Sequence, residues 1–134
     1  TRDILHVCGL LATGDSLDVL VVHLPSRSGG AKVSEPYRML VAGKIRSIAD
    51  SLLTTRLHPQ LIIMGDFNDY PNNKSITQTL GALAPPPHPA PLQLYHLLAS
   101  RAEAEKYSFG SYKYQGEWGL LDHLIISGTL LDNS

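Results

Sequence analysis

Apolar and polar positions along the chain follow a strand period first and a helical period next. Residues 3–12 and 17–24 are two apolar runs joined by Thr13-Gly14-Asp15-Ser16, a turn signal of hairpin length. The second run, Leu-Asp-Val-Leu-Val-Val-His-Leu, is β-branched and nearly all apolar, which predicts a strand buried on both faces. We therefore expect a strand pair at the start, with His23 at the end of its second strand.

A helical period follows the Gly-rich loop at residues 25–30. Ser34 suits the N-cap, Glu35 and Pro36 suit the first turn, and the helix is expected to end near Thr55. One apolar stripe at helical spacing comprises Leu40, Val41, Ile45, Ile48, Ala49, Leu52 and Leu53. The polar residues expected mostly off this stripe are Arg38, Lys44, Arg46 and Asp50.

The apolar run Leu61–Met64 predicts a buried central strand, and Gly65 then allows a sharp turn. Strand, helix and strand across residues 17–66 predict a right-handed β-α-β crossover. We then expect a short helix at 74–83 and an extended proline-rich surface loop at 85–91. A helix is expected at 92–105, with Leu94, Leu97 and Leu98 pointing inward. The last expected elements are a short strand at 111–114, a turn at 115–117 and a strand at 118–127. The whole chain, residues 1–134, is expected to be a single α/β domain.

Composition narrows the class of protein. Hydrophobic residues make up 43% and charged residues 17%, which is typical of a soluble globular domain. The longest apolar runs are too short to span a bilayer, and no signal peptide is visible. These features do not determine the cellular compartment. A net charge of −1 provides no broad basic field for nucleic acid, and the single Cys8 excludes an internal disulfide.

Candidate chemistry gathers where the apolar runs end. Asp66 and Asn68 directly follow the central strand, and ligands bind at the carboxyl ends of strands in α/β sheets. A carboxylate can accept a proton or bind a hard cation, and an amide can hold an oxyanion or a water. The Asp-x-Asn-Asp run fits an Asx turn equally well. An EF-hand is excluded because Tyr70 and Pro71 occupy the fifth and sixth positions of its loop.

Three motifs in order change the balance between these alternatives: His-Leu-Pro-Ser-Arg from His23, Gly-Asp-Phe-Asn-Asp from Gly65, and Leu-Leu-Asp-His-Leu-Ile-Ile-Ser around Asp122. Together they resemble the endonuclease/exonuclease/phosphatase superfamily, the DNase I-like group, along nearly the whole chain. The resemblance implies a two-sheet α/β sandwich, here only in part, with a mixed sheet flanked by helices. It also implies hydrolysis of phosphate esters with a divalent metal, Mg²⁺ first and Mn²⁺ or Ca²⁺ as alternatives.

The resemblance implies a role for each matching residue. His23 would stabilise charge on the scissile phosphate, Asp66 would orient and deprotonate the attacking water, and Asn68 would bind a phosphate oxygen. Asp66 and Asn68 are also the expected metal ligands. Asp122 would orient a second histidine. We assign His123 to the opposite face of its strand without a catalytic role, because neighbours in a strand point to opposite faces.

Arg27, Ser26 and Trp118 are weaker candidates for substrate binding. Arg27 and Ser26 follow His23 and are placed to reach a phosphate, but a solvated loop explains them equally well. Trp118, with Tyr112 and Tyr114, fits ordinary strand packing best, and stacking on a substrate base or head group is the alternative. The substrate class therefore stays open among nucleic acid, phospholipid and small phosphodiesters.

The family pattern also includes groups that the chain lacks. The main metal-binding glutamate and an earlier asparagine are expected upstream of Thr1, and a terminal Ser-Asp-His motif is expected after Asp122. We therefore expect an internal fragment that is inactive alone and that self-associates through an uncovered apolar face. A non-catalytic binding or structural domain that retains the phosphoesterase scaffold is the alternative.

Overall fold

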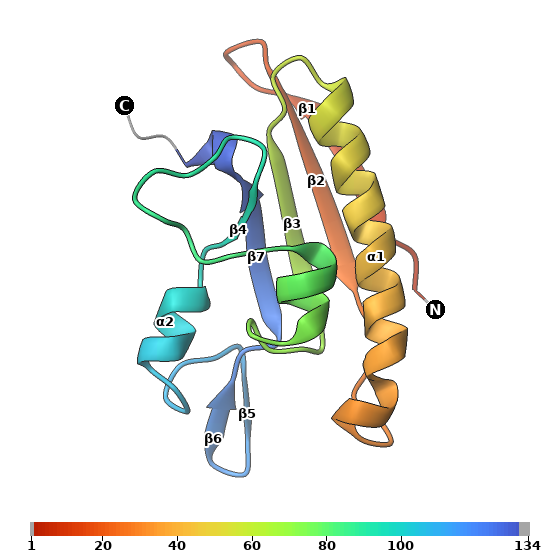
Figure 1. The fold of residues 1–134 in the computed structure, drawn as a ribbon, viewed down its shortest axis with the longest axis vertical. Helices are drawn as coiled ribbons and strands as arrows, with labels where there is room; N and C mark the ends of the chain where they lie inside the picture. Colours follow the sequence, from red (N-terminus) through yellow and green to blue (C-terminus); the bar gives the residue numbers. More distant parts are fainter. Residues whose placement is uncertain (1, 132–134) are drawn as a thin grey trace.

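The computed structural model describes residues 2–131 as a five-stranded mixed sheet, a long helix and a small two-stranded ribbon (Figure 1). The strands are β1 (Leu5–Leu10), β2 (Ser16–His23), β3 (Leu61–Asp66), β4 (Leu94–His96), β5 (Tyr112–Tyr114), β6 (Glu117–Gly119) and β7 (Asp122–Ser127). The helices are α1 (Ala31–Thr55), α2 (Ala99–Ala104), the π-helical turn η1 (Ser75–Leu80) and the 3₁₀ turn η2 (Gly128–Leu130).

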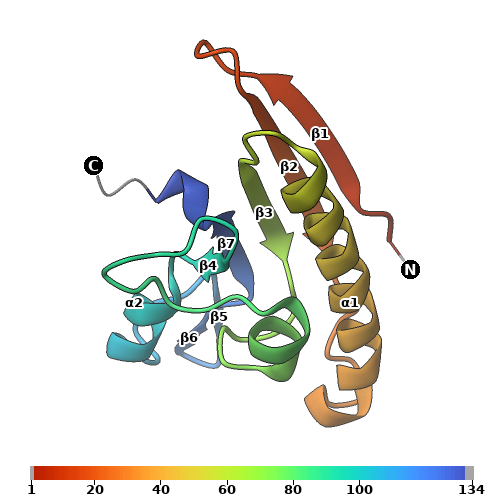
Figure 2. The same cartoon turned by 45° about the horizontal axis from the view of Figure 1, so that its top comes forward.

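The sheet has the strand order β1-β2-β3-β7-β4. β2 and β3 are parallel and are connected by α1, which confirms the predicted crossover, and the other pairs are antiparallel. Figures 1 and 2 show α1 lying along one face of the sheet, with η1 beside it. We call this face the covered face.

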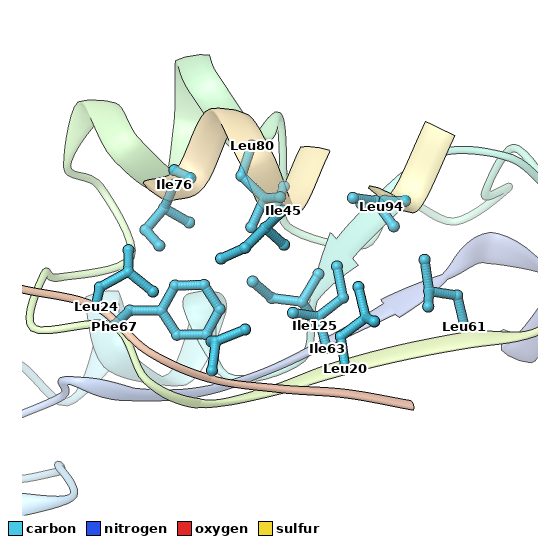
Figure 3. Packing of buried hydrophobic residues seen from close by; sticks show 14 of the residues in the cluster. Leu20, Leu24, Ile45, Leu61, Ile63, Phe67, Ile76, Leu80, Leu94 and Ile125 are labelled. Carbon is cyan, nitrogen blue, oxygen red and sulfur yellow. The ribbon is translucent and has the colours of Figure 1, made fainter. Parts of the chain in front are cut away.

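The core lies between the covered face and these helices. Leu20, Ile63 and Ile125 are directly paired across β2, β3 and β7, and all three are fully buried. Ile45 from α1 and Leu80 from η1 pack over them (Figure 3). Burial of branched aliphatic side chains stabilises such a core by roughly 1.5–3 kcal/mol for each residue.

The opposite face, which we call the open face, is apolar but partly exposed. Leu5, Val7 and Met64 retain 57%, 49% and 39% of their accessible surface, and Val19 and Val21 of β2 are only half buried. The prediction that residues 17–24 would be buried on both faces is therefore wrong, because α1 and η1 cover only one.

The start of α1 also differs from the prediction. The helix begins at Ala31 after Gly30, and Ser34 lies inside it, where its hydroxyl donates to the Gly30 carbonyl oxygen at 2.7 Å. The expected stripe was wrong at two positions: Leu40 is 63% exposed, whereas Arg38 is 1% exposed. Arg38 is buried because a carboxylate from a distant loop pairs with it, as described below.

The second half of the chain contains the largest errors of prediction. Residues 92–105 form strand β4 and the short helix α2 rather than one helix, because Leu94–His96 pair with β7. The expected strand at 118–127 is split into β6 and β7, and the expected helix at 74–83 is the shorter π-helical turn η1. Residues 85–91 form no helix or strand, as predicted. Within residues 2–131, no helix is both long and apolar enough to traverse a bilayer.

Candidate active site

Three of the predicted site residues lie side by side across the sheet. His23 ends β2, Asp66 ends β3 and Asp122 begins β7, and the register pairs His23 with Asp66 and Asp66 with Asp122. Directly paired residues point to the same face of a sheet, and the alternation with buried Val22 puts all three on the open face. We call them the catalytic row, after the roles that the family resemblance implies for them.

The side chains of the row are accessible to solvent. His23 Nε2 lies 3.6 Å from Asp66 Oδ2, and the two side chains are 44% and 36% exposed. A contact of this length between exposed polar groups contributes little to stability. The contact therefore leaves both groups available to a ligand.

Asn68 is fixed beside the row by the turn that follows β3. Its backbone N–H donates to Asp66 Oδ1 at 2.9 Å, and its side-chain Nδ2 donates to the Leu24 carbonyl oxygen at 2.7 Å. The second bond leaves the amide oxygen of Asn68 as an acceptor. Gly65 makes the close approach possible, because it has φ 139° and a Cβ there would lie 2.0 Å from the Val22 carbonyl oxygen.

A buried carboxylate supports this turn from beneath. Asp69 Oδ1 lies 2.9 Å from Arg27 Nη1 and 2.8 Å from Arg38 Nε, and Ser75 donates to Asp69 Oδ2 at 2.6 Å. The Arg38 Nε contact is an ion pair without hydrogen-bond alignment. We call Asp69, Arg27, Arg38 and Ser75 the anchor cluster.

The anchor cluster connects three segments of the chain. Arg38 also donates to Ser34 Oγ at 2.6 Å, to the Ala31 carbonyl oxygen at 2.7 Å and to the Ser26 carbonyl oxygen at 3.2 Å. Because a buried charge is costly unless it is paired and hydrogen-bonded, these contacts fix the site loop against the start of α1.

His123 lies on the covered face, so the structure confirms that it and Asp122 point in opposite directions. Its Nε2 donates to the Asp69 carbonyl oxygen at 2.6 Å, and its ring stands 4.5 Å from that of His96. Burial lowers the pKa of His123 and lowers that of His96 to about 3, so both rings are neutral.

The remaining predicted binding residues lie apart from the catalytic row. Arg27 belongs to the anchor cluster and also donates to the Asn68 carbonyl oxygen at 3.2 Å. The Ser26 hydroxyl donates to Ser28 Oγ at 3.0 Å in an exposed loop. Trp118 lies on β6 and borders a separate cavity. The structure thus brings together His23, Asp66, Asn68 and Asp122.

Sequence reasoning missed the anchor cluster. A signal for Arg38 was present, since it precedes Ala42 by four residues and Ile45 by seven and so shares the buried helical stripe. No comparable signal marks Asp69, because its partners come from the loop before α1, from α1 and from η1.

The described residues supply at most part of a metal site. Within residues 2–131, no group of three or more His, Cys, Asp or Glu side chains is arranged to hold a metal ion. The oxygens of Asp66 and Asn68 are nevertheless hard donors of the kind that Mg²⁺ prefers, and Mg²⁺ often takes only one or two carboxylates from a protein.

Comparison with the solved structures of TDP2 shows a shared fold. Truncated Caenorhabditis elegans TDP2 superimposes with a TM-score of 0.62 at 14% identity, over 92% of this chain and 45% of that one. Another structure of TDP2 from C. elegans gives 0.58 at 16% identity, over 92% and 35%. The human Nocturnin catalytic domain with bound sulfate anion gives 0.48 at 16% identity, over 87% and 37%. The chain thus spans less than half of each of these structures.

No curated protein sequence matches the chain significantly. A family model does match it, over residues 1–134, and that model describes the Endonuclease/Exonuclease/phosphatase family. The mixed sheet flanked by helices and the fold shared with TDP2 agree with this match. The chain therefore belongs to the Endonuclease/Exonuclease/phosphatase family.

Proposed function

We propose that this chain supplies part of the active site of a divalent-metal-dependent phosphoesterase. Members of the superfamily are hydrolases that act on phosphate esters. The observation that carries the finer proposal is the catalytic row, in which the strand register aligns His23, Asp66 and Asp122 on one accessible face. A purely structural sheet gains nothing from placing two carboxylates and an imidazole side by side on its exposed face.

Asp66 is the proposed base for the attacking water. Its Oδ1 is held by the Asn68 N–H, which fixes the carboxylate, and its side chain remains 36% exposed to water. A general base needs this combination of fixed geometry and access to the proton that it removes. The amide oxygen of Asn68 is an acceptor, and its Nδ2 is engaged by Leu24, so in this conformation Asn68 favours a cation or water over a phosphate oxygen.

His23 and Asp122 have different proposed roles in the row. His23 would donate to a phosphate oxygen and stabilise the charge that develops there, because phosphoryl transfer depends mainly on positioning and charge stabilisation. Asp122 would orient a second histidine from a part of the polypeptide outside the described residues. This role explains a carboxylate that is exposed at the start of an otherwise apolar strand.

Asp66, together with the Asn68 oxygen, is also the proposed protein part of a magnesium site, for which Mn²⁺ or Ca²⁺ are the alternatives. When bound, the ion would polarise the phosphate and lower the pKa of a coordinated water. The missing donors would come from additional segments, which agrees with a chain that spans under half of its structural neighbours.

The substrate is a phosphate ester carried by nucleic acid, a phospholipid or a small phosphodiester. A family fold alone does not select among these classes. The net charge of −1 favours substrates other than long duplex DNA, whose binding usually needs many Lys and Arg contacts.

The test is Mg²⁺-dependent hydrolysis of bis(p-nitrophenyl) phosphate by this chain and by a longer version of the polypeptide. We expect activity in the longer version only, and Asp66→Ala should lower kcat by orders of magnitude with little change in KM. Asp50→Ala on the exposed surface of α1 is the matched control. Activity without Mg²⁺, or activity retained in Asp66→Ala, contradicts the proposal. Inactivity of both versions favours the non-catalytic scaffold.

A further inference from the structure

A cavity of about 670 Å³ is lined by none of the residues of the catalytic row and has no role in the mechanism above. Its walls come from the loop after Asp69, the segment that follows η1, helix α2 and the β5–β6 ribbon. Figure 1 shows η1, α2 and this ribbon around the same end of the molecule. The volume is in the range of small-molecule sites.

The walls of this cavity are unusually rich in aromatic side chains. Six of the nine aromatic residues of the chain border it, namely Tyr70, Tyr107, Phe109, Tyr112, Tyr114 and Trp118. Four of these six are substantially exposed, so strand packing does not explain them. Exposed aromatic surface that gathers around a concave site marks a ligand-binding surface.

Part of the aromatic wall is held in place. Tyr70 Oη lies 3.3 Å from Tyr112 Oη, and Gly119 packs so closely that a Cβ there would lie 2.4 Å from the Tyr112 ring. Burial, followed by the bond to Tyr112, raises the pKa of Tyr70 to about 12, so its phenol is neutral. The Tyr70 ring therefore offers a fixed, uncharged surface at neutral pH, and Tyr112 packs against Gly119 beside it.

The charges around the cavity favour a planar neutral group over a cation. Guanidinium or ammonium groups of the chain already lie 4.1–5.8 Å from the rings of Tyr70, Phe109, Tyr107 and Trp118. Since these rings already attract cations of the chain, a ligand cation meets competition and repulsion. A planar π-system can still stack on a free ring face.

Hydrogen-bonding groups on the cavity wall suit the edge of a nucleobase. The carboxylates of Glu103 on α2 and Glu117 on β6 are acceptors for exocyclic amino groups, and the loop after Asp69 contributes the amides of Asn72 and Asn73. Lys106 is the basic group on the wall and suits a phosphate attached to the base.

Two segments that line the cavity continue along the chain into the segments that carry Asn68 and Asp122. Tyr70 follows Asn68 by two residues, and Leu120 precedes Asp122 by two residues. A hydrogen bond of 2.8 Å from the Phe67 N–H to the Leu121 carbonyl oxygen joins these two segments. A ligand seated in the cavity would thus adjoin the backbone that carries the row.

We propose that this aromatic cavity binds a nucleobase of the substrate, which makes the substrate a nucleotide or an unpaired stretch of nucleic acid. The identity of the substrate rests on the proposed phosphoesterase function, whereas binding of the base itself does not. Adenine is the probe of choice because it combines a large π-face with an exocyclic amino group.

Trp118 allows a direct test, because it is the only tryptophan of the chain and it borders the cavity. Its fluorescence is titrated with adenosine, adenosine 5′-monophosphate, ribose 5-phosphate and phosphocholine. We expect a saturable change with adenosine and its monophosphate and none with the other two. Because adenosine carries no phosphate, this result is independent of whether the chain hydrolyses esters.

Variants locate the site. Tyr114→Ala and Tyr107→Ala should each weaken adenosine binding roughly 5- to 150-fold, the equivalent of about 1–3 kcal/mol for loss of one stacking partner. Tyr37→Ala is the matched control, since Tyr37 on α1 is 64% exposed, as is Tyr114, and does not border the cavity. Circular dichroism checks that each variant is folded.

Saturation by phosphocholine but not adenosine would overturn the proposal in favour of a cationic head group. Absence of saturation by adenosine, or equal affinities in Tyr114→Ala, Tyr107→Ala and Tyr37→Ala, would also overturn it. A short oligodeoxyadenylate distinguishes the two sources of the base: tighter binding than the monophosphate indicates a strand, and equal binding indicates a mononucleotide.

Discussion

Removal of the Asp69 carboxylate should destabilise the protein far more than removal of a surface carboxylate. Asp69 is in contact with Arg38, Arg27 and Ser75, and both Asp69 and Arg38 are almost completely buried. Asp69→Ala leaves the Arg38 charge buried without a counter-charge. Breaking one partner of a buried pair costs about 3–5 kcal/mol, which is a large part of the roughly 5–15 kcal/mol that stabilises a typical domain.

The assay is urea denaturation followed by far-UV circular dichroism, with the free energy of unfolding taken from the linear extrapolation. The matched control is Asp50→Ala, which removes an exposed i,i+4 partner of Arg46 and should cost about 0.3–0.5 kcal/mol. An m-value that stays constant between the variants would show that their denatured states are comparable.

Two double-mutant cycles separate the partners of Asp69. Arg38 is 1% exposed and Arg27 is 29% exposed, so the coupling of Asp69 to Arg38 should exceed its coupling to Arg27. Asp69→Leu combined with Arg38→Met should recover much of the loss, because apolar groups of similar volume often replace a buried pair without cost. The reasoning would be refuted if Asp69→Ala lowered the free energy of unfolding by less than about 1 kcal/mol. Equal coupling of Asp69 to Arg38 and to Arg27 would refute it as well.

Three further predictions concern other parts of the fold. Gly65→Ala should lower the free energy of unfolding by at least about 1–3 kcal/mol in thermal denaturation, since Gly65 has φ 139° and the Val22 carbonyl leaves no room for a Cβ; an unchanged Tm would contradict this. The pKa of His96 falls from 6.5 to about 3 on folding, so the unfolded state binds more protons and stability should decrease as the pH falls through that window. His96→Leu should reduce the slope of the free energy of unfolding against pH by about 1.4 kcal/mol per pH unit. An unaltered slope would exclude His96 as the cause of this pH dependence. The exposed apolar surface of the open face should drive self-association, which sedimentation would detect; Met64→Lys should weaken it, and Leu57→Lys in a loop should not.

Much of the scaffold was predictable because its signals are local. The continuous apolar runs at residues 17–24 and 61–64 identified β2 and β3, and the helical period identified most of α1. Those elements end at His23 and Asp66, so the positions of both candidate residues at strand ends also followed from the sequence. Asn68 was found because the turn that carries it comes directly after β3.

The errors arose where distant segments decide the structure. Leu94–His96 became a strand because β7 offers backbone partners, which overrides helical propensity in that segment. Ser111 Oγ accepts from the N–H groups of Leu121 and Asp122, at the point where the chain passes from β6 in the two-stranded ribbon to β7 in the large sheet. Arg38 is buried only because Asp69 reaches it from beyond β3. Local periodicity contains none of this information.

The alignment of the catalytic row has a consequence for insertions and deletions. Asp122 and His123 are neighbours on β7, one on the open face and one on the covered face. Shifting β7 by a single residue against β3 would exchange them, placing an imidazole beside Asp66 and a carboxylate in the core. An insertion between Leu121, whose carbonyl oxygen accepts from the Phe67 N–H, and Asp122 at the start of β7 would therefore break the alignment of the catalytic row.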